Sequence, residues 1–88
     1  MTKTYIVVIA HAVGNPEAGY DIVHDWDGRQ FPDKAQATGH GFALAESDDF
    51  NIGVVEDGRL ASLWWMDIKL DETAAMLAQI GAEIGLKA

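Results

Sequence analysis

The sequence contains no cysteine, which excludes a disulfide framework, a thiolate metal site and a cysteine nucleophile, and suits a cytoplasmic protein. It also contains no long hydrophobic run. The apolar stretch from Tyr5 to Ala10 is too short for a signal-peptide core and far too short to span a bilayer, so we expect no membrane partner. Basic residues are scarce: six lysines and arginines stand against fourteen acids, for a net charge of −8. Such a surface repels phosphate backbones and predicts no nucleic-acid partner.

The chain of 88 residues, of which 49% are hydrophobic, predicts a single globular domain over residues 1–88. Residues 5–13 are rich in β-branched side chains and predict a buried strand. Asn15-Pro16 then marks a loop. Residues 20–26 alternate as a half-buried strand does, with one face formed by Tyr20, Ile22, His24 and Trp26. Asp27-Gly28 follows as a two-residue turn signal.

Residues 48–67 predict a hairpin that turns at Asp57-Gly58, because both positions tolerate positive φ. A two-residue loop pairs Glu56 with Arg59, and the register follows by counting outward. One face of the ribbon then holds the pairs Val54–Ala61, Ile52–Leu63 and Phe50–Trp65. The other face holds Val55–Leu60, Gly53–Ser62, Asn51–Trp64 and Asp49–Met66. The adjacent Trp64 and Trp65 therefore point to opposite sides.

Two helices are expected. The first begins after Asp33, which can form a capping box with Gln36, and ends at about Ala45. Its inward side is expected to contain Ala35, Thr38, Gly41, Phe42 and Ala45, and its glycines, Gly39 and Gly41, favour close approach to a sheet.

The second helix is expected to be capped by Asp71. Its buried stripe would consist of Thr73, Met76, Leu77, Ile80 and Ile84. Gly85 predicts a left-handed C-cap with Leu86 folding back towards Ile80.

The order β-β-α-β-β-α predicts an α+β domain with two layers, an antiparallel-rich sheet carrying both helices on one face. The helices would cover the face of Trp65 and leave the face of Trp64 open, and a small monomer rarely exposes such a patch. We therefore expect a homodimer joined through that face, or through swapped strands near it. The interface candidates are Trp64, Met66, Leu60, Val55 and Asn51. A ligand groove or a partner-protein site on the same face is the alternative.

No catalytic constellation is present, and the sequence predicts no catalytic residue, no metal and no cofactor. It lacks an H-x-x-x-H pair, a glycine-rich phosphate loop and a nucleophile elbow. His24 fits a hydrogen-bonded core histidine or, alternatively, the polar element of a ligand site. Arg29 and Arg59 each follow Asp-Gly, as an anion clamp or as cross-strand partners of acids such as Glu56. The acids Glu46, Asp48 and Asp49 predict a solvated loop or, alternatively, a weak divalent-cation site.

The pattern F-x-x-K-A-x-A-x-x-x-G-x-x-L-A at residues 31–45, followed by SDDFNIGVVEDGRLASLWWMD, resembles small bacterial proteins of unknown function with a Lys-Ala-opened helix and an Asp-Gly-Arg hairpin. This resemblance covers roughly residues 20–67 and implies a small α+β domain without an assigned activity. Residues 5–44 are also similar, more faintly, to HicB-type antitoxins in the layout of strands and helix, although the Pro-Gly-Cys type turn of that family is missing.

Three functional hypotheses follow. The first is a non-catalytic cytoplasmic domain that acts as a homodimer or protein-binding module. The second is an acidic, antitoxin-like inhibitor of a basic protein partner, which the net charge favours. The third is a small ligand-binding protein or enzyme that uses the Trp64 face, with His24 or His11 as its polar element.

Overall fold

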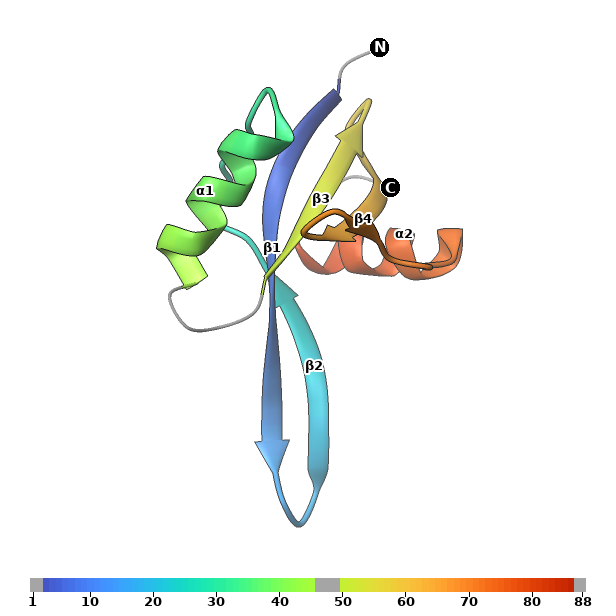
Figure 1. Ribbon diagram of the computed structural model, residues 1–88. Coiled ribbons are helices and arrows are strands. Elements are labelled where there is room, and N and C mark those ends of the chain that lie inside the picture. The colour runs from blue at the N-terminus through green and yellow to red at the C-terminus, as the bar shows by residue number, and fades with distance from the viewer. Residues whose placement is uncertain (1–2, 46–49, 87–88) are drawn as a thin grey trace.

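The computed structural model describes residues 3–45 and 50–86, which form five strands and two helices (Figure 1). In chain order the elements are β1 (Lys3–Asn15), β2 (Gly19–Asp25), α1 (Lys34–Ala45), β3 (Phe50–Glu56), β4 (Arg59–Trp65), β5 (Ile68–Lys69) and α2 (Ala74–Glu83). The α+β class and the predicted order are confirmed, with the short β5 added before α2. The predicted acidic loop of Glu46, Asp48 and Asp49 lies outside the described residues. No helix in the described ranges has the length and apolar character needed to cross a membrane.

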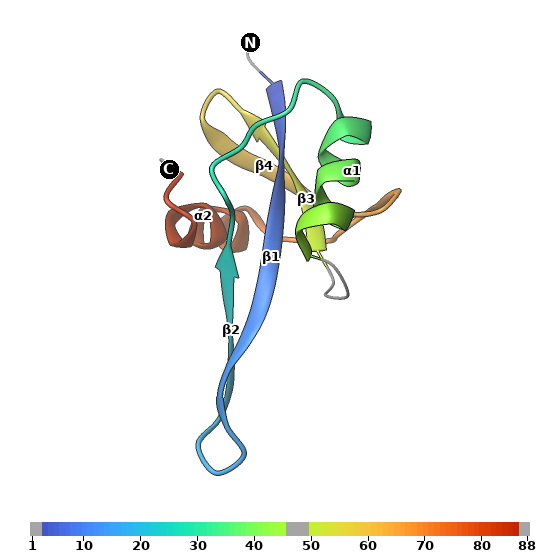
Figure 2. The same cartoon turned by 90° about the vertical axis from the view of Figure 1, so that its left-hand side faces the viewer.

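The sheet is antiparallel, with the strand order β2-β1-β3-β4-β5. The long strand β1 changes partner at Ile9: residues 3–9 pair with β3, and residues 9–15 pair with β2. Beyond Ile9 the sheet therefore consists of two strands only. We call residues 10–23 the hairpin arm. Figures 1 and 2 show, in two perpendicular views, that the arm projects away from the rest of the molecule.

The Asp27-Gly28 segment does not form a hairpin loop. After β2 the chain leaves the edge of the sheet and returns at Phe31, which forms an isolated antiparallel bridge with Tyr5. Two backbone hydrogen bonds of 2.9 and 2.8 Å make this bridge. Within the excursion the Asp27 side chain accepts a 3.0 Å bond from the Arg29 backbone N–H, and Gly28 has φ +84°. The predicted two-residue turn is instead an Asx-type bend. It carries the chain from the end of β2 to Phe31, which pairs with β1 further along the same edge.

The β3–β4 hairpin turns at Asp57-Gly58, as predicted, and Glu56 pairs with Arg59. Both turn residues have positive φ, +52° and +82°. The register prediction holds for one further pair and then is wrong, because a β-bulge shifts the register between Val54 and Val55. Ala61 is the extra residue on β4: the observed pairs beyond it are Val54–Ser62, Gly53–Leu63 and Ile52–Trp64.

The two helices lie on opposite faces of the sheet, which corrects the predicted two-layer arrangement (Figures 1 and 2). Side chains alternate along β1, so Ile6 and Val8 point to one face and Val7 to the other. The first core lies under α2 and consists of Ile6, Val8, Val55, Leu60, Leu63, Ile80 and Ile84. The second core lies under α1 and consists of Val7, Ala37, Ala45, Phe50 and Ile52. The sheet is thus sandwiched between the helices.

Helix α1 is capped as predicted by Asp33, whose Oδ1 accepts a 2.8 Å bond from the Gln36 backbone N–H. The inward side differs in part from the prediction: Ala37, Gly41 and Ala45 are buried, whereas Ala35 and Phe42 are exposed. At Gly41 a Cβ would collide with the ring of Phe50, so this glycine does permit close helix–sheet contact. Gly39 faces open space.

Helix α2 is capped by Thr73 rather than by Asp71, because the Thr73 hydroxyl accepts the Met76 backbone N–H at 3.1 Å. Its C-terminus is as predicted. Gly85 has φ +89°, and the Leu86 backbone N–H donates to the Gly81 carbonyl at 2.7 Å, a Schellman arrangement. Of the predicted stripe, Ile80 and Ile84 are buried and Leu77 is half-buried, whereas Thr73 and Met76 are exposed.

Candidate functional site

The adjacent tryptophans point to opposite faces, but with the roles of the two exchanged. The bulge at Ala61 places Trp64 on the α1 side, where it is half-buried and packs against the second core. Trp65 was expected in the interior and is instead 44% exposed. The Trp64 indole N–H donates to the Ser62 hydroxyl at 3.1 Å. Trp64 therefore lies on the sheet face that carries α1 and packs in part against its own chain.

The predicted interface residues do not share one open face. Val55 and Leu60 are buried in the first core, because α2 covers the face that was expected to be free. Asn51 is half-buried, with its side-chain amide 3.5 Å from the Trp64 carbonyl oxygen. Met66 lies in the turn between β4 and β5, with φ +55° and its side chain exposed. The predicted interface requires these residues to lie on one open face of the sheet, and the structure does not place them on one.

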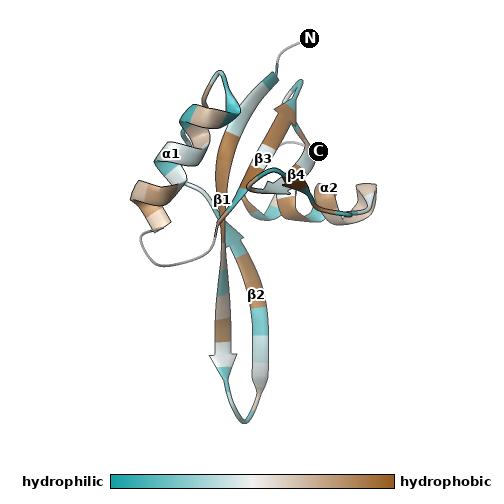
Figure 3. Cartoon of the chain, viewed as in Figure 1, coloured by the Kyte–Doolittle hydropathy of each residue, from teal (hydrophilic) through white to brown (hydrophobic). Residues whose placement is uncertain are grey.

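A different exposed apolar surface is the hairpin arm. Every residue from 10 to 23 is exposed, and on both strands of the arm hydrophobic bands alternate with polar ones (Figure 3). Its large apolar side chains are Val13, Tyr20, Ile22 and Val23, of which Tyr20 and Ile22 are 61% and 57% exposed. The alternating pattern of residues 20–26 correctly indicates a strand, but the expected half-burial is reached only at His24 and Trp26.

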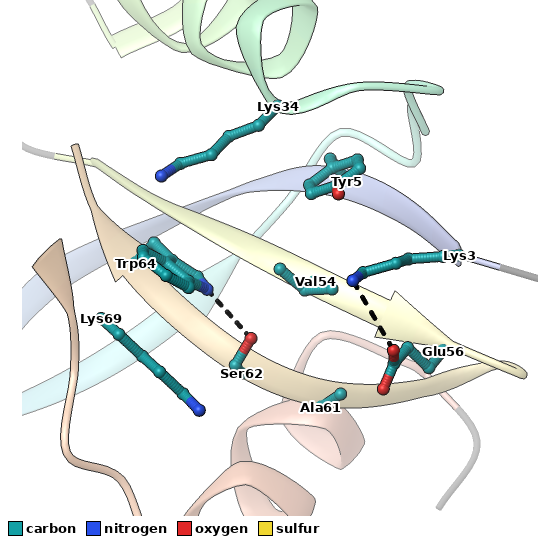
Figure 4. Close-up of a pocket in the computed structure, with 9 residues that line it drawn as sticks. All are labelled: Lys3, Tyr5, Lys34, Val54, Glu56, Ala61, Ser62, Trp64 and Lys69. Atoms are coloured by element: carbon teal, nitrogen blue, oxygen red, sulfur yellow. Dashed lines mark hydrogen bonds and ion pairs between the residues drawn. The ribbon is translucent and has the colours of Figure 1, made fainter. Parts of the chain in front are cut away.

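A concave surface lies on the α1 side of the sheet, and we call it the lysine groove (Figure 4). Its volume is about 320 Å³. The residues that line it are Lys3, Tyr5, Lys34, Val54, Glu56, Ala61, Ser62, Trp64 and Lys69. The groove thus contains three of the six basic residues of the chain and one of its fourteen acids. A net positive concavity on a strongly acidic chain is a local feature that the total charge conceals.

The groove exists because α1 covers only part of its face of the sheet. The helix packs over Val7, Phe50 and Ile52, towards one end of the strands. Towards the other end the same face continues without a helix over it, through Tyr5 on β1 and Val54 on β3. The bulge brings Ser62 and Trp64 of β4 onto this face, opposite Val54 and Ile52, and Lys69 of β5 pairs with Trp64. Four strands therefore form its floor.

The lysines approach the groove from three directions (Figure 4). Lys34 is the first residue of α1, and its Nζ lies 4.2 Å from the centroid of the Trp64 ring, a cation–π contact. The same Nζ lies 3.7 Å from Oδ1 of Asp67, whose side chain is fully exposed. Lys3 lies 3.8 Å from Glu56. Both ion pairs have solvent-exposed members and hold the lysines only weakly.

Two of the three histidines fasten the end of β2 to the helices. His24 lies on β2, and both its backbone N–H and its Nδ1 face the carboxylate of Glu83 on α2, the Nδ1 at 3.3 Å. The backbone N–H bond, together with the imidazole, holds the pKa of Glu83 below its ordinary value. His24 is thus hydrogen-bonded, as expected, although at the border of the core rather than within it.

The second histidine contact joins α1 to the bend after β2. Nε2 of His40 lies 2.6 Å from Oδ2 of Asp27. Partial burial raises the pKa of Asp27, but the hydrogen bonds from His40 and from the Arg29 backbone outweigh it and leave the pKa lowered. The His40 ring also lies 5.0 Å from the ring of Phe31. We call the pairs His24–Glu83 and His40–Asp27 the latches, because each joins a helix to β2 or to the bend that follows it.

The two arginines have different surroundings. The Arg29 guanidinium lies over the Phe31 ring at 5.9 Å. Arg59 lies at the β3–β4 turn beside the C-terminal end of α2, where it lines a shallow groove with Trp26, Gly85 and Leu86. Its backbone pairs with Glu56, as predicted. The structure gives the two arginines no shared partner among the described residues, so the anion clamp receives no support.

The described residues contain no group of three or more histidine and carboxylate side chains arranged to hold a metal ion. Comparison of the chain with protein-family models, with curated proteins and with solved structures finds no match. The resemblances noted from the sequence stay predictions. The lysine groove was missed from the sequence because Lys3, Lys34 and Lys69 are far apart in the chain, and only the alternation of Lys3 and Tyr5 with Val7 signals a shared face.

Proposed function

We propose that the protein is a non-catalytic cytoplasmic domain that forms a homodimer by pairing the hairpin arms of two copies. The observation that carries this proposal is that every residue of the arm is exposed, including the large apolar side chains of Val13, Tyr20, Ile22 and Val23. In this proposal the two copies associate through swapped or paired strands of the arm, and not through the Trp64 face.

The arm is expected to be only weakly stable in a free monomer. A two-stranded ribbon is only marginally stable in water without a third strand or a helix to cover it. Among the described residues, β1 has no partner in the arm on the side where β3 pairs with its first seven residues, and β2 is the edge strand of the sheet. Exposed edges of this kind pair with further strands unless the chain protects them.

A second copy of the chain fits this edge better than an arbitrary strand does. If two β2 strands pair antiparallel about a twofold axis centred on Ile22, the seam is limited to the part of β2 before His24, because the backbone N–H of His24 already donates to Glu83 of its own chain. Asp21 then faces Val23 of the partner subunit, so no two carboxylates are directly opposed. The two Asp21 side chains lie diagonally, at about 7–8 Å, a separation that salt screens. The two sheets become one continuous sheet.

The test is the mass of the protein as a function of concentration, measured by sedimentation equilibrium. We expect a reversible dimer that tightens modestly as salt is added. Ile22→Glu places a charge at the centre of the seam on both copies and weakens the dimer by more than about tenfold. Because Ile22 is exposed, this variant keeps the fold of the monomer.

Met76→Glu is the matched control, since Met76 is also an exposed apolar residue but lies on α2. It leaves the dissociation constant unchanged. A wild-type protein that stays monomeric at every concentration, or an equal effect of the two variants, overturns the proposal.

A further inference from the structure

The lysine groove carries a second inference, independent of the dimer. The residues that line the groove include three lysines and one acid, a net excess of two positive charges on a chain of net charge −8, and Asp67 outside the lining pairs with Lys34. Folding has brought together basic side chains from β1, α1 and β5. Gathering like charges costs free energy, and the exposed partners Glu56 and Asp67 relieve this cost only in part.

The floor of the groove supplies flat apolar surface. Trp64 and Tyr5 supply aromatic side chains, and Val54 on β3 and Ala61 on β4 supply aliphatic ones (Figure 4). The indole N–H is bonded to Ser62, and the Lys34 ammonium lies 4.2 Å from the centroid of the ring, so a ligand that stacks on Trp64 takes the place of Lys34. An aromatic ring with ammonium groups around it suits a planar molecule that carries a negative charge.

We propose that the lysine groove binds a small organic anion, namely a planar aromatic body with a carboxylate or phosphate group. The body takes the place of the Lys34 ammonium on Trp64 and lies beside Val54, and the anionic group is held by the displaced Lys34 and by Lys69. The volume of about 320 Å³ is at the small end of ligand pockets and fits one or two fused rings with a charged substituent.

A small anion fits better than an extended polyanion such as a nucleic acid strand. Outside the groove the chain has three basic residues and thirteen acids, so a strand that leaves the groove at either end meets repulsion. A ligand that fits wholly within the groove avoids that surface.

The experiment is a titration of the intact ¹⁵N-labelled protein followed by NMR, with 1-naphthyl phosphate and 1-naphthoate as probes. We expect saturable shifts of the Trp64 indole N–H and of the amides of Val54 and Ser62. 1-Naphthalenemethanol, a neutral molecule of similar shape, binds at least about tenfold more weakly, because charge-assisted contacts are lost. The two anions separate the sources: a phosphate preference indicates a phosphate ester as the ligand, and equal binding indicates that charge alone is recognised.

Lys69→Gln removes one groove charge from an exposed position and lowers the affinity by about tenfold. Arg29→Gln removes the same charge outside the groove and changes the affinity less than about twofold. Equal losses in the two variants overturn the proposal, as does equal binding of the neutral probe. An oligonucleotide that binds more tightly with increasing length overturns it in favour of a nucleic-acid surface.

The ligand proposal and the dimer proposal can be tested separately. Ile22→Glu, which breaks the proposed seam in the arm, leaves the naphthyl phosphate titration unchanged, since Ile22 is not among the residues that line the groove. A failed titration therefore refutes the groove ligand and leaves the dimer untouched.

Discussion

The β1–β2 and β3–β4 hairpins are both antiparallel ribbons with apolar side chains on alternate positions, yet they have opposite surroundings. Six residues of β3 and β4 belong to the buried cores: Phe50, Ile52, Val54, Val55, Leu60 and Leu63. No residue of β2 is buried. The difference lies in what covers them. Helices α1 and α2 pack on the two faces of the central strands, whereas the arm extends beyond both helices (Figure 1).

An alternating pattern of apolar and polar residues shows that a strand can bury one of its faces. It does not show that another part of the chain covers that face. The Tyr20–Ile22 side of the arm has the same pattern as the covered face of β3. Within the described residues, the pairing of β1 with β3 ends at Ile9, six residues before the end of β1, and neither α1 nor α2 covers the arm. We infer that the surplus length serves contacts outside the chain.

The largest expected effect comes from inserting one alanine between Ser62 and Leu63 of β4. If the bulge at Ala61 is kept, every residue beyond the insertion shifts by one position, so that Leu63 turns away from α2 and Trp64 turns towards it. We expect a loss of more than about 3 kcal/mol of unfolding free energy in urea denaturation.

Insertion of one alanine after Ala18, at the tip of the arm, is the matched control. It also adds one alanine to a hairpin, but the affected backbone is exposed, and we expect a change below about 1 kcal/mol. Similar losses for the two insertions would contradict the contrast between the hairpins.

A smaller effect is expected from truncating one isoleucine in each hairpin. Ile52 is 1% exposed in the second core, and Ile52→Ala costs about 3 kcal/mol through lost burial and a residual cavity. Ile22→Ala in the arm costs less than about 0.5 kcal/mol, measured at a concentration where the protein is monomeric. A large loss in dilute Ile22→Ala would show that the arm is packed within its own chain.

The smallest effect concerns the two latches at the junction between arm and body. The pKa of Asp27 and that of Glu83 are lowered in the folded protein from their ordinary values of 3.8 and 4.5. A carboxyl with a lower pKa when folded adds stability above its unfolded value and loses it as the pH falls through the folded value. The contribution of the latches is therefore complete above about pH 4.5 and declines at lower pH, that of Glu83 below 4.5 and that of Asp27 below 3.8.

The double variant Asp27→Asn, Glu83→Gln removes this source of acid sensitivity. Its unfolding free energy declines less steeply with acid than that of the wild type, in urea denaturation at a series of pH values. Parallel acid profiles would show that the latches contribute nothing.

The features that sequence reasoning predicted correctly are local. The β3–β4 turn depends on two residues with positive φ, the start of α1 on the Asp33 side chain, and the end of α2 on Gly85. Each depends on hydrogen bonds or backbone torsions within a few residues. The cap of α2 was misplaced by two residues because Asp71 and Thr73 are both competent caps, and only the observed bond to Met76 distinguishes them.

The features that it missed depend on contacts distant in the chain. A bulge shifts all pairs beyond it, so a single extra residue at Ala61 exchanged the roles of Trp64 and Trp65 and, with them, the predicted interface. Placing both helices on one face was wrong for a related reason: the first strand has apolar residues on both sides, Val7 opposite to Ile6 and Val8, and this pattern already permitted a helix on each face.

The sequence by itself determined the class of this protein, the order of its elements and the chemistry of its turns and caps, because these follow from torsional preferences and periodicity over short stretches. Only the tertiary structure decided which tryptophan faces inward, that three lysines meet over Trp64, and that the β1–β2 arm extends uncovered. Those outcomes depend on strand register and on how far each helix reaches across the sheet, and both are set by side-chain packing between segments that lie far apart in the chain.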